Sequence, residues 1–250
     1  MRIEQVLSER LLAVTKLVTK GNRVADIGCD HAYTSIYLVE KEIAPYAVAM
    51  DINAGPIERA KENVTQYGLT EKICVRRSDG VKELAPEEAD TLLITGMGGL
   101  LMKKILSDKP EVTAAAKELV LQPQSEVEEL RRFLHSIGYA ITAEQMCRDE
   151  GKFYVMFRAE KAKTESPVPA DREVENKLQN GENSVWTDLE YRYGAHLLKE
   201  RPAVFLDYLR YELTQKEDIL AELSGIETEK VQVRKEQLTK EAEELRCLLA

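Results

Sequence analysis

The sequence lacks the features typical of membrane, secreted and metal-binding proteins. None of its apolar runs approaches the roughly 18 to 20 residues that a membrane-spanning helix needs. Its beginning has no apolar segment of a secretory signal. The four cysteines lie far apart, with neither a CxxC pair nor the spacing of metal ligands, which favours a reducing compartment. We therefore expect a soluble cytoplasmic protein that uses no metal.

Basic residues are outnumbered by acidic ones. The chain has 35 basic and 44 acidic residues, a formal net charge of −9. This balance excludes a surface coated in positive charge, although a local basic patch remains compatible with it. Any contact with nucleic acid would therefore depend on individual basic side chains. The candidates are Arg10, Lys16, Lys20, Arg23, Arg76, Arg77, Lys103, Lys104, Arg192, Lys199, Arg201 and Arg210.

Up to about residue 160, short apolar runs alternate with helical patterns. The predicted strands are 24–27, 47–50, 73–75, 91–94 and 119–121. Three predicted helices are 2–20, 33–42 and 100–109. Another has Pro56 in its first turn and ends at Gly68. The last opens at Ser125 with a capping box to Glu128 and ends at Gly138. Two extended runs, 140–147 and 153–157, predict a hairpin. Together they indicate an α/β protein with a Rossmann-like doubly wound sheet.

The composition changes near Ala162. A linker-like Ser-Pro-Val-Pro stretch at 166–169 precedes a region whose leucines recur with helical spacing. Val231, Leu238 and Leu245 repeat every seven residues, which predicts an antiparallel helical hairpin resembling a short coiled coil. We expect a catalytic domain over 1–162 and a helical domain over 163–250. The helical domain is either a packing element or a substrate-binding arm.

The most informative segment follows the first predicted strand, where 24–27 runs into Gly28 and then a helix. In doubly wound sheets this turn is the nucleotide-binding corner. The G-x-G-x-x-G pattern of dinucleotide sites is absent, and acids stand at Asp26 and Asp30. An acidic turn repels pyrophosphate but suits a cationic ligand, so the pattern favours S-adenosylmethionine over a nicotinamide cofactor.

Two more acids end the next two strands. Asp51 is placed to bind both ribose hydroxyls of a nucleoside cofactor, and Asp79 is placed to meet its adenine amino group. A single aspartate at a strand end is usually a turn or cap residue, but three in succession favour a cofactor site. The predicted cofactor-binding residues are Asp26, Gly28, Asp51, Ile52, Ser78, Asp79, Gly80, Gly96 and Met97.

Glycine is concentrated after the fourth strand, in Gly96-Met97-Gly98-Gly99. Glycines there let the backbone approach a flat ligand and expose N–H groups at a helix start. The alternative is a tight turn between strand and helix. Gln122 and Gln124 follow the fifth strand and supply amides to the same edge of the sheet, or else cap the next helix.

Three motifs together carry a family resemblance. Asp-Ile-Gly-Cys-Asp-His-Ala-Tyr at 26–33, Gly-Met-Gly-Gly at 96–99 and Leu-Gln-Pro-Gln at 121–124 resemble the bacterial tRNA (adenine(22)-N1)-methyltransferase family. The resemblance covers the whole length and includes a helical C-terminal extension. It implies a Rossmann-like domain that uses S-adenosyl-L-methionine to methylate N1 of an adenine in the D-arm region of tRNA. The alternatives are a methyltransferase acting on a small molecule or protein, and a non-catalytic binding module.

The resemblance also suggests roles around the target base. Asp30 and His31 are the candidate catalytic residues, although His31 is equally expected to cap the following helix. The candidate substrate-binding residues are Arg10, Tyr33, Gly98, Gly99, Gln122 and Tyr154. The two tyrosines could stack on the target base, although a tyrosine on the surface of an α/β domain is more often a core residue. The expected partner is tRNA, and a monomer is favoured over an oligomer.

Overall fold

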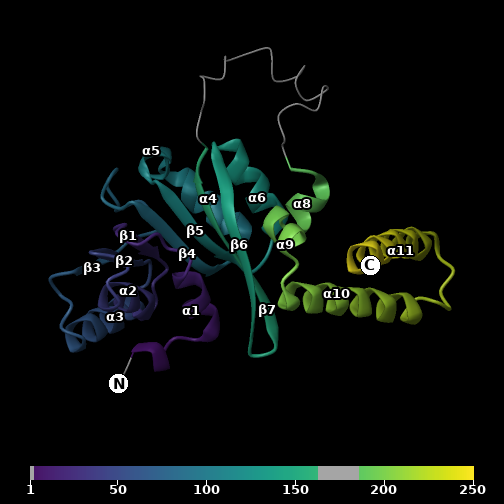
Figure 1. Cartoon of the computed structure of the whole chain (residues 1–250), viewed down its shortest axis with the longest axis horizontal. Helices are drawn as coiled ribbons and strands as arrows, with labels where there is room; N and C mark the ends of the chain where they lie inside the picture. Colours follow the sequence, from purple (N-terminus) through teal and green to yellow (C-terminus); the bar gives the residue numbers. More distant parts are fainter. Residues whose placement is uncertain (1–2, 163–185) are drawn as a thin grey trace, which may run out of the picture. The chain divides into compact units, whose positions relative to one another are not determined.

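The computed structural model describes residues 3–162 and 186–250. It divides into two compact units, one within Met1–Leu198 and the other over Lys199–Ala250 (Figure 1). The linker expected at 166–169 lies outside the described residues. The predicted boundary between residues 162 and 163 also adjoins that undescribed segment, and it stays a prediction.

The first unit is built on a seven-stranded sheet. Its strand order is β3-β2-β1-β4-β5-β7-β6. The strands are β1 (Val24–Ile27), β2 (Ala47–Asp51), β3 (Ile73–Arg77), β4 (Thr91–Met97), β5 (Glu118–Pro123), β6 (Tyr139–Asp149) and β7 (Lys152–Lys161). Strands β1 to β5 pair in parallel, and the β6–β7 hairpin joins β5 through an antiparallel β7. The doubly wound α/β fold and the hairpin predicted from the sequence are confirmed.

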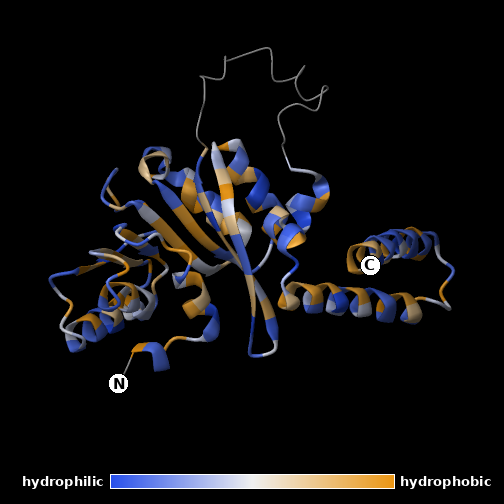
Figure 2. Cartoon of the chain, in the orientation of Figure 1, coloured by the Kyte–Doolittle hydropathy of each residue, from blue (hydrophilic) through white to orange (hydrophobic). Residues whose placement is uncertain are grey.

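Helices cover both faces of this sheet. In chain order they are the 3-10 helix η1 (Ile3–Gln5), α1 (Glu9–Thr15), α2 (Tyr33–Glu40), α3 (Ala54–Gln66), α4 (Gly99–Asp108), α5 (Pro110–Ala115), α6 (Val127–Ser136), α8 (Asp188–Tyr193) and α9 (Ala195–Glu200). Alternate strand residues point to opposite faces. Ile27 and Ile94 pack with apolar side chains of α4, α5 and α6, whereas Val24 and Leu93 pack with α1, α2 and α3. The strands of this core are largely in hydrophobic colours in Figure 2.

Two helix predictions were wrong. The helix expected over 2–20 is broken, because the Ser8 side chain accepts a hydrogen bond from Leu11 N and starts α1 at Glu9. The capping box expected between Ser125 and Glu128 does not form. Ser125 Oγ donates to Glu126 Oε2 instead, and α6 begins at Val127 after Glu126 adopts a left-handed conformation.

Strands β4 and β5 run further than the sequence predicted, and this extension shapes the edge of the sheet. Their pairing register shifts between Thr95 and Met97, so that Gly96 forms an irregularity with φ +74°. A shift of this kind turns a strand away from regular pairing and commonly stands beside a functional site. It puts Gly96 and Gln122 at the carboxyl ends of adjacent strands.

The second unit is a helical hairpin. Helix α10 (Ala203–Glu222) and α11 (Glu229–Leu249) pack against each other, with Ser224 and Gly225 in the connection. Leu238 and Leu245 of the seven-residue repeat are buried. Lys216 and Arg246 form ion pairs across the two helices, with Glu241 and Glu217. Within the described residues, none of the helices is both long and apolar enough to cross a membrane.

Candidate active site

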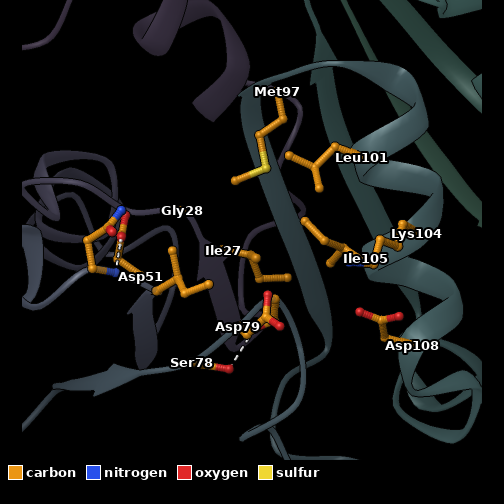
Figure 3. A pocket seen from close by; sticks show the side chains of 13 residues that line it. Ile27, Gly28, Asp51, Ser78, Asp79, Met97, Leu101, Lys104, Ile105 and Asp108 are labelled. Atoms are coloured by element: carbon orange, nitrogen blue, oxygen red, sulfur yellow. Dashed lines mark hydrogen bonds between the residues drawn. The ribbon is translucent and has the colours of Figure 1, made fainter.

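A cavity of about 250 Å³ opens at the carboxyl ends of β1 to β4, beside α4 (Figure 3). It lies where a doubly wound sheet binds its ligands. Seven predicted cofactor residues line it: Gly28, Asp51, Ile52, Ser78, Asp79, Gly80 and Met97. The other lining residues are Ile27, Asn53, Leu101, Lys104, Ile105 and Asp108. The cavity therefore combines carboxylates and a hydroxyl with apolar walls.

Asp51 is fixed at the end of β2. Its Oδ1 accepts a hydrogen bond from Asn53 N at 2.8 Å, and its carbonyl accepts one from Ser78 N at 2.9 Å. The Ser78 hydroxyl in turn donates to Gly80 O at 2.7 Å. These bonds hold the ends of β2 and β3 together and present the Asp51 carboxylate to the cavity. A carboxylate held in this way can accept both hydroxyls of a ribose.

Asp79 follows β3 and is more exposed to solvent than Asp51. It forms an ion pair with Lys82, and this pairing lowers the pKa of the Asp79 carboxyl below its usual value. Asp79 is therefore ionised throughout the physiological range. Its side chain faces the cavity from the opposite side to Lys104 and Asp108 of α4 (Figure 3).

Gly28 forms the turn after β1 with φ +79°. Its N–H donates to Met50 O at 2.8 Å, which ties the turn to β2. A Cβ atom at this position would lie 2.2 Å from Met97 Cε. The backbone conformation therefore favours glycine here, and any side chain would also force the flexible end of Met97 to move.

Asp26 does not line the cavity, although it precedes Gly28 by only two residues. Strand alternation turns its side chain to the sheet face covered by α2, where Ser35 Oγ donates to Asp26 Oδ2 at 2.8 Å. The side chain is buried, and this desolvation raises the pKa of Asp26 to about 6. Its contact with Ser35 holds Asp26 beneath the Gly28 turn, outside the lining of this cavity.

A second polar cluster stands beside the cavity, at the ends of β4 and β5. Gln122 is buried, and its Oε1 accepts hydrogen bonds from Gly96 N at 3.1 Å and Arg10 Nη1 at 2.5 Å. The Arg10 guanidinium lies over the Tyr154 ring, with Cζ 5.3 Å from the ring centroid. The fold thus joins four of the predicted site residues, from α1, β4, β5 and β7. We name Arg10, Gly96, Gln122 and Tyr154 the Arg10 cluster.

Comparison with known proteins identifies this arrangement. The methyltransferase-domain family profile matches residues 7–157. The tRNA (adenine(22)-N(1))-methyltransferase of Bacillus subtilis (strain 168) is 33% identical over 221 residues, which cover 88% of this chain and 87% of that protein. The chain belongs to the tRNA (adenine(22)-N1)-methyltransferase family. The family and the enzyme class predicted from the three motifs are confirmed.

Solved structures of similar proteins agree with this assignment over nearly the whole chain. The B. subtilis tRNA methyltransferase TrmK superposes with a TM-score of 0.79 at 31% identity, covering 98% of this chain and 99% of that one. The Streptococcus pneumoniae protein Sp1610, solved in complex with S-adenosyl-L-methionine, gives 0.79 at 28% identity, covering 98% and 100%. The helical C-terminal extension is therefore part of the fold that this methyltransferase family shares.

The remaining predicted residues lie outside both the cavity lining and the Arg10 cluster. Gly98 and Gly99 begin α4 of this methyltransferase and pack on the turn before α6, where a Cβ on Gly99 would lie 2.5 Å from Glu126 O. This close packing favours the tight-turn interpretation of the two glycines. Asp30, His31 and Tyr33 form a separate group after the Gly28 turn. The rings of His31 and Tyr33 stack with centroids 5.6 Å apart, and Asp30 lies 3.5 Å from His31 Nε2.

Sequence reasoning missed one wall of the methyltransferase cavity. Four residues of α4 form that wall: Leu101, Lys104, Ile105 and Asp108. Their spacing of three, four and seven residues marks a single helical face. This spacing could have indicated the wall from the sequence, because a helix that follows a strand-end loop turns one face toward the ligand-binding edge of the sheet.

Proposed function

We propose that this protein transfers a methyl group from S-adenosyl-L-methionine to N1 of adenine 22 in the D-arm region of tRNA. The observation that carries the proposal is the match to the B. subtilis tRNA (adenine(22)-N(1))-methyltransferase, which spans 88% of this chain. A methyltransferase acting on a small molecule would share the cavity. It would not account for the likeness to the B. subtilis enzyme structure, which covers 98% of this chain and so includes the C-terminal helices.

The cavity residues fit the cofactor chemically. The Asp51 carboxylate suits the ribose hydroxyls, and the Asp79 carboxylate suits the adenine amino group. Ile27, Ile52 and Ile105 supply apolar surface for the adenine ring. When bound, S-adenosylmethionine supplies a methyl carbon made electrophilic by its positively charged sulfur. Asp26 would support the cofactor's amino-acid end through the Gly28 turn.

Methylation of adenine N1 needs no general base, because N1 has a free lone pair. The task of the protein is to expose the Watson–Crick edge of the adenine and hold N1 in line with the methyl group. The base becomes cationic as the bond forms, so a nearby carboxylate would stabilise it. We propose Asp30 and His31 for this neighbourhood because they follow the Gly28 turn directly.

The helical hairpin formed by α10 and α11 is proposed as a tRNA-binding arm. The candidate phosphate contacts are Lys199 and Arg201, which precede the hairpin, and Arg210 on α10, although Arg210 also pairs with Asp207 at 2.8 Å. We further propose that the enzyme acts in the cytoplasm as a monomer. Its four cysteines are all free thiols, as expected in a reducing compartment.

The decisive experiment uses tRNA from cells that lack this gene. Purified protein and S-adenosylmethionine are added, and nucleosides are analysed by mass spectrometry. We expect 1-methyladenosine, mapped to adenine 22 by fragment analysis. Cofactor binding without any methylated nucleoside would indicate a non-RNA substrate or a binding module. Methylation at another adenine would show that adenine 22 is not the target nucleotide.

A further inference from the structure

Arg10 is half-buried, and its backbone N–H donates to Asp149 Oδ2 at 3.2 Å, but within the described residues its guanidinium has no carboxylate partner. Its Nη1 donates to the neutral Gln122 amide, and its guanidinium faces the Tyr154 ring. Across residues 3–162 and 186–250, the structure gives this guanidinium no carboxylate partner and no second hydrogen bond. Most of its N–H donors are therefore available to a ligand.

Other partly buried arginines of the same unit differ from Arg10 in this respect. Arg23 pairs with Asp90 at 2.9 Å, and Arg76 pairs with Glu88 at 2.6 Å. Burying a guanidinium is costly unless its charge is compensated. A cation held by an amide and an aromatic ring keeps its full charge for an incoming anion, so the environment of Arg10 fits anion binding.

Gln122 fixes this cation in place. Its Nε2 donates to Pro123 O at 3.1 Å while its Oε1 accepts from Gly96 N and Arg10. Rotating the amide by half a turn would set an N–H donor against the Gly96 N–H, so only one orientation satisfies all three bonds. Gln122 is fully buried, which makes it a positioning residue rather than a substrate contact. This differs from the substrate-binding role predicted from the sequence.

The position of the cluster indicates the anion. Gly96 immediately precedes Met97, whose side chain lines the cavity, so Arg10 stands beside the cavity that would hold the methyl donor. A nucleotide whose base enters this region brings its own phosphate with it. A guanidinium matches a phosphate group through paired hydrogen bonds.

Building on the proposed function, we infer that Arg10 binds a phosphate at the target nucleotide of tRNA and that Gln122 acts through Arg10 by holding its guanidinium toward that phosphate. The Tyr154 ring supports the guanidinium from one side. Gln122 also fixes Gly96, so a single buried amide couples the phosphate contact to the loop that borders the cavity.

The test is a double-mutant cycle on tRNA binding, without methyl transfer. Unmodified tRNA transcript is titrated with wild-type protein, Arg10→Gln, Gln122→Met and the double variant between 50 and 200 mM salt. We expect each single variant to lower affinity about tenfold and the double variant to equal Arg10→Gln, because linked residues are non-additive. In the variants that lack the Arg10 contact, the negative slope of log affinity against log salt should become shallower by roughly 0.7 to 0.9, which corresponds to the loss of one phosphate contact.

Two further variants serve as controls. Gln122→Glu keeps an acceptor for Arg10 and Gly96 but pairs the cation with a carboxylate and loses the donor to Pro123 O, so it should weaken tRNA binding at least as much as Gln122→Met. Lys117→Gln removes one positive charge next to the opposite end of β5, where Lys117 pairs with Asp90 at 3.0 Å, and it should leave the salt slope unchanged. S-adenosylmethionine affinity, measured by calorimetry, should stay within about twofold for Arg10→Gln.

The outcomes separate the possible errors. Weaker binding with an unchanged salt slope would overturn the phosphate contact in favour of a base contact. Additive losses of affinity in the double variant would overturn the positioning role of Gln122. So would a Gln122→Met protein that melts at a lower temperature but binds tRNA as tightly as wild type. If wild-type protein makes 1-methyladenosine while either result holds, only this inference fails. If wild-type protein neither binds nor methylates tRNA, the proposed function fails as well.

Discussion

The cofactor cavity and the Arg10 cluster lie side by side at one edge of the sheet but carry opposite charge. The cavity presents the carboxylates of Asp51 and Asp79, whereas the Arg10 cluster presents a cation that a neutral amide holds. Gly96 of the Arg10 cluster and Met97 of the cavity are neighbours in the chain. Under the two proposals above, an acidic protein with a net charge of −9 would bind a cationic cofactor and an anionic nucleic acid on adjoining surfaces.

The largest effect is expected at Asp26, the carboxylate beneath the cavity. Its pKa of about 6 in the folded state lies above its unfolded value of 3.8, because burial disfavours the charged form. The folded state keeps its proton while the unfolded state loses it, so this group lowers stability as pH rises from about 4 to 6. The total is about 3 kcal/mol. Asp26→Asn removes that dependence and keeps an oxygen to accept from Ser35.

We therefore expect the free energy of unfolding of Asp26→Asn, relative to wild type, to rise by about 2.4 kcal/mol between pH 4 and pH 7 and by about 3 kcal/mol over the full titration. Urea unfolding of both proteins at matched pH values measures this difference, and other titrating groups cancel in the comparison. A difference that stays constant with pH would show that the Asp26 carboxyl titrates normally.

Asp51 tests whether the cavity binds cofactor independently of the Arg10 cluster. Asp51→Ala removes the carboxylate proposed for two ribose hydroxyls, and hydrogen bonds to charged groups contribute about 1.5–3 kcal/mol each. We expect S-adenosylmethionine affinity to fall about a hundredfold by calorimetry, which corresponds to about 2.7 kcal/mol. Asp51→Asn keeps one acceptor oxygen, so its S-adenosylmethionine affinity should fall only about tenfold.

The same Asp51→Ala protein should bind tRNA within about twofold of wild type, since its change lies on the cofactor side. This is the reciprocal of the result expected for Arg10→Gln. Loss of both affinities in either variant would mean that the two regions form a single site.

Gly28 sharpens the comparison at the turn that closes the cavity. Gly28→Ala forces a side chain into a φ of +79° and places Cβ 2.2 Å from Met97 Cε. Gly21→Ala is a matched control, because Gly21 has φ +93° with no atom within 4 Å of its Cβ. We expect backbone strain to lower the free energy of unfolding of each variant by about 1 kcal/mol. The free energy of unfolding of Gly28→Ala should fall by about 1 kcal/mol more, because the Met97 side chain must move.

Cofactor calorimetry distinguishes these two glycine variants further. Only Gly28→Ala should weaken S-adenosylmethionine binding, since only Gly28 lines the cavity. Equal stabilities and equal cofactor affinities for the two variants would show that the Met97 side chain adapts without cost.

The sequence predicted the cavity side of this comparison better than the Arg10 side. Strand-end acids and glycines fall at fixed points of a doubly wound sheet, so Gly28, Asp51 and Asp79 could be placed from local pattern alone. Arg10 and Gln122 are 112 residues apart in the chain, and their hydrogen bond depends on how α1 packs on the sheet. Both residues were predicted in the site, but the burial of Gln122 and its bond to Arg10 are tertiary facts.

Local competition explains the other differences between prediction and structure. The apolar spacing over 2–20 favours one long helix, yet a Ser8 cap restarts the chain at Glu9. The Ser-x-x-Glu pattern at Ser125 favours a capping box. There, Gly99 N donates to Ser125 O at 2.9 Å and Gln124 N donates to Met97 O at 2.9 Å, and these bonds hold the segment against the start of α4.

The smallest effect is expected at Asp79, where the cavity is most exposed to solvent. The ion pair with Lys82 lowers the pKa of this carboxyl, so it stays ionised at more acidic pH than a free aspartate. Asp79→Asn should weaken S-adenosylmethionine binding only about fivefold, because a solvent-exposed hydrogen bond competes with water. The loss should be the same at pH 6 and pH 8, since the carboxyl does not titrate between them. A loss that grows toward pH 8 would mean that a group titrating between these pH values, rather than the fixed charge of Asp79, controls adenine binding.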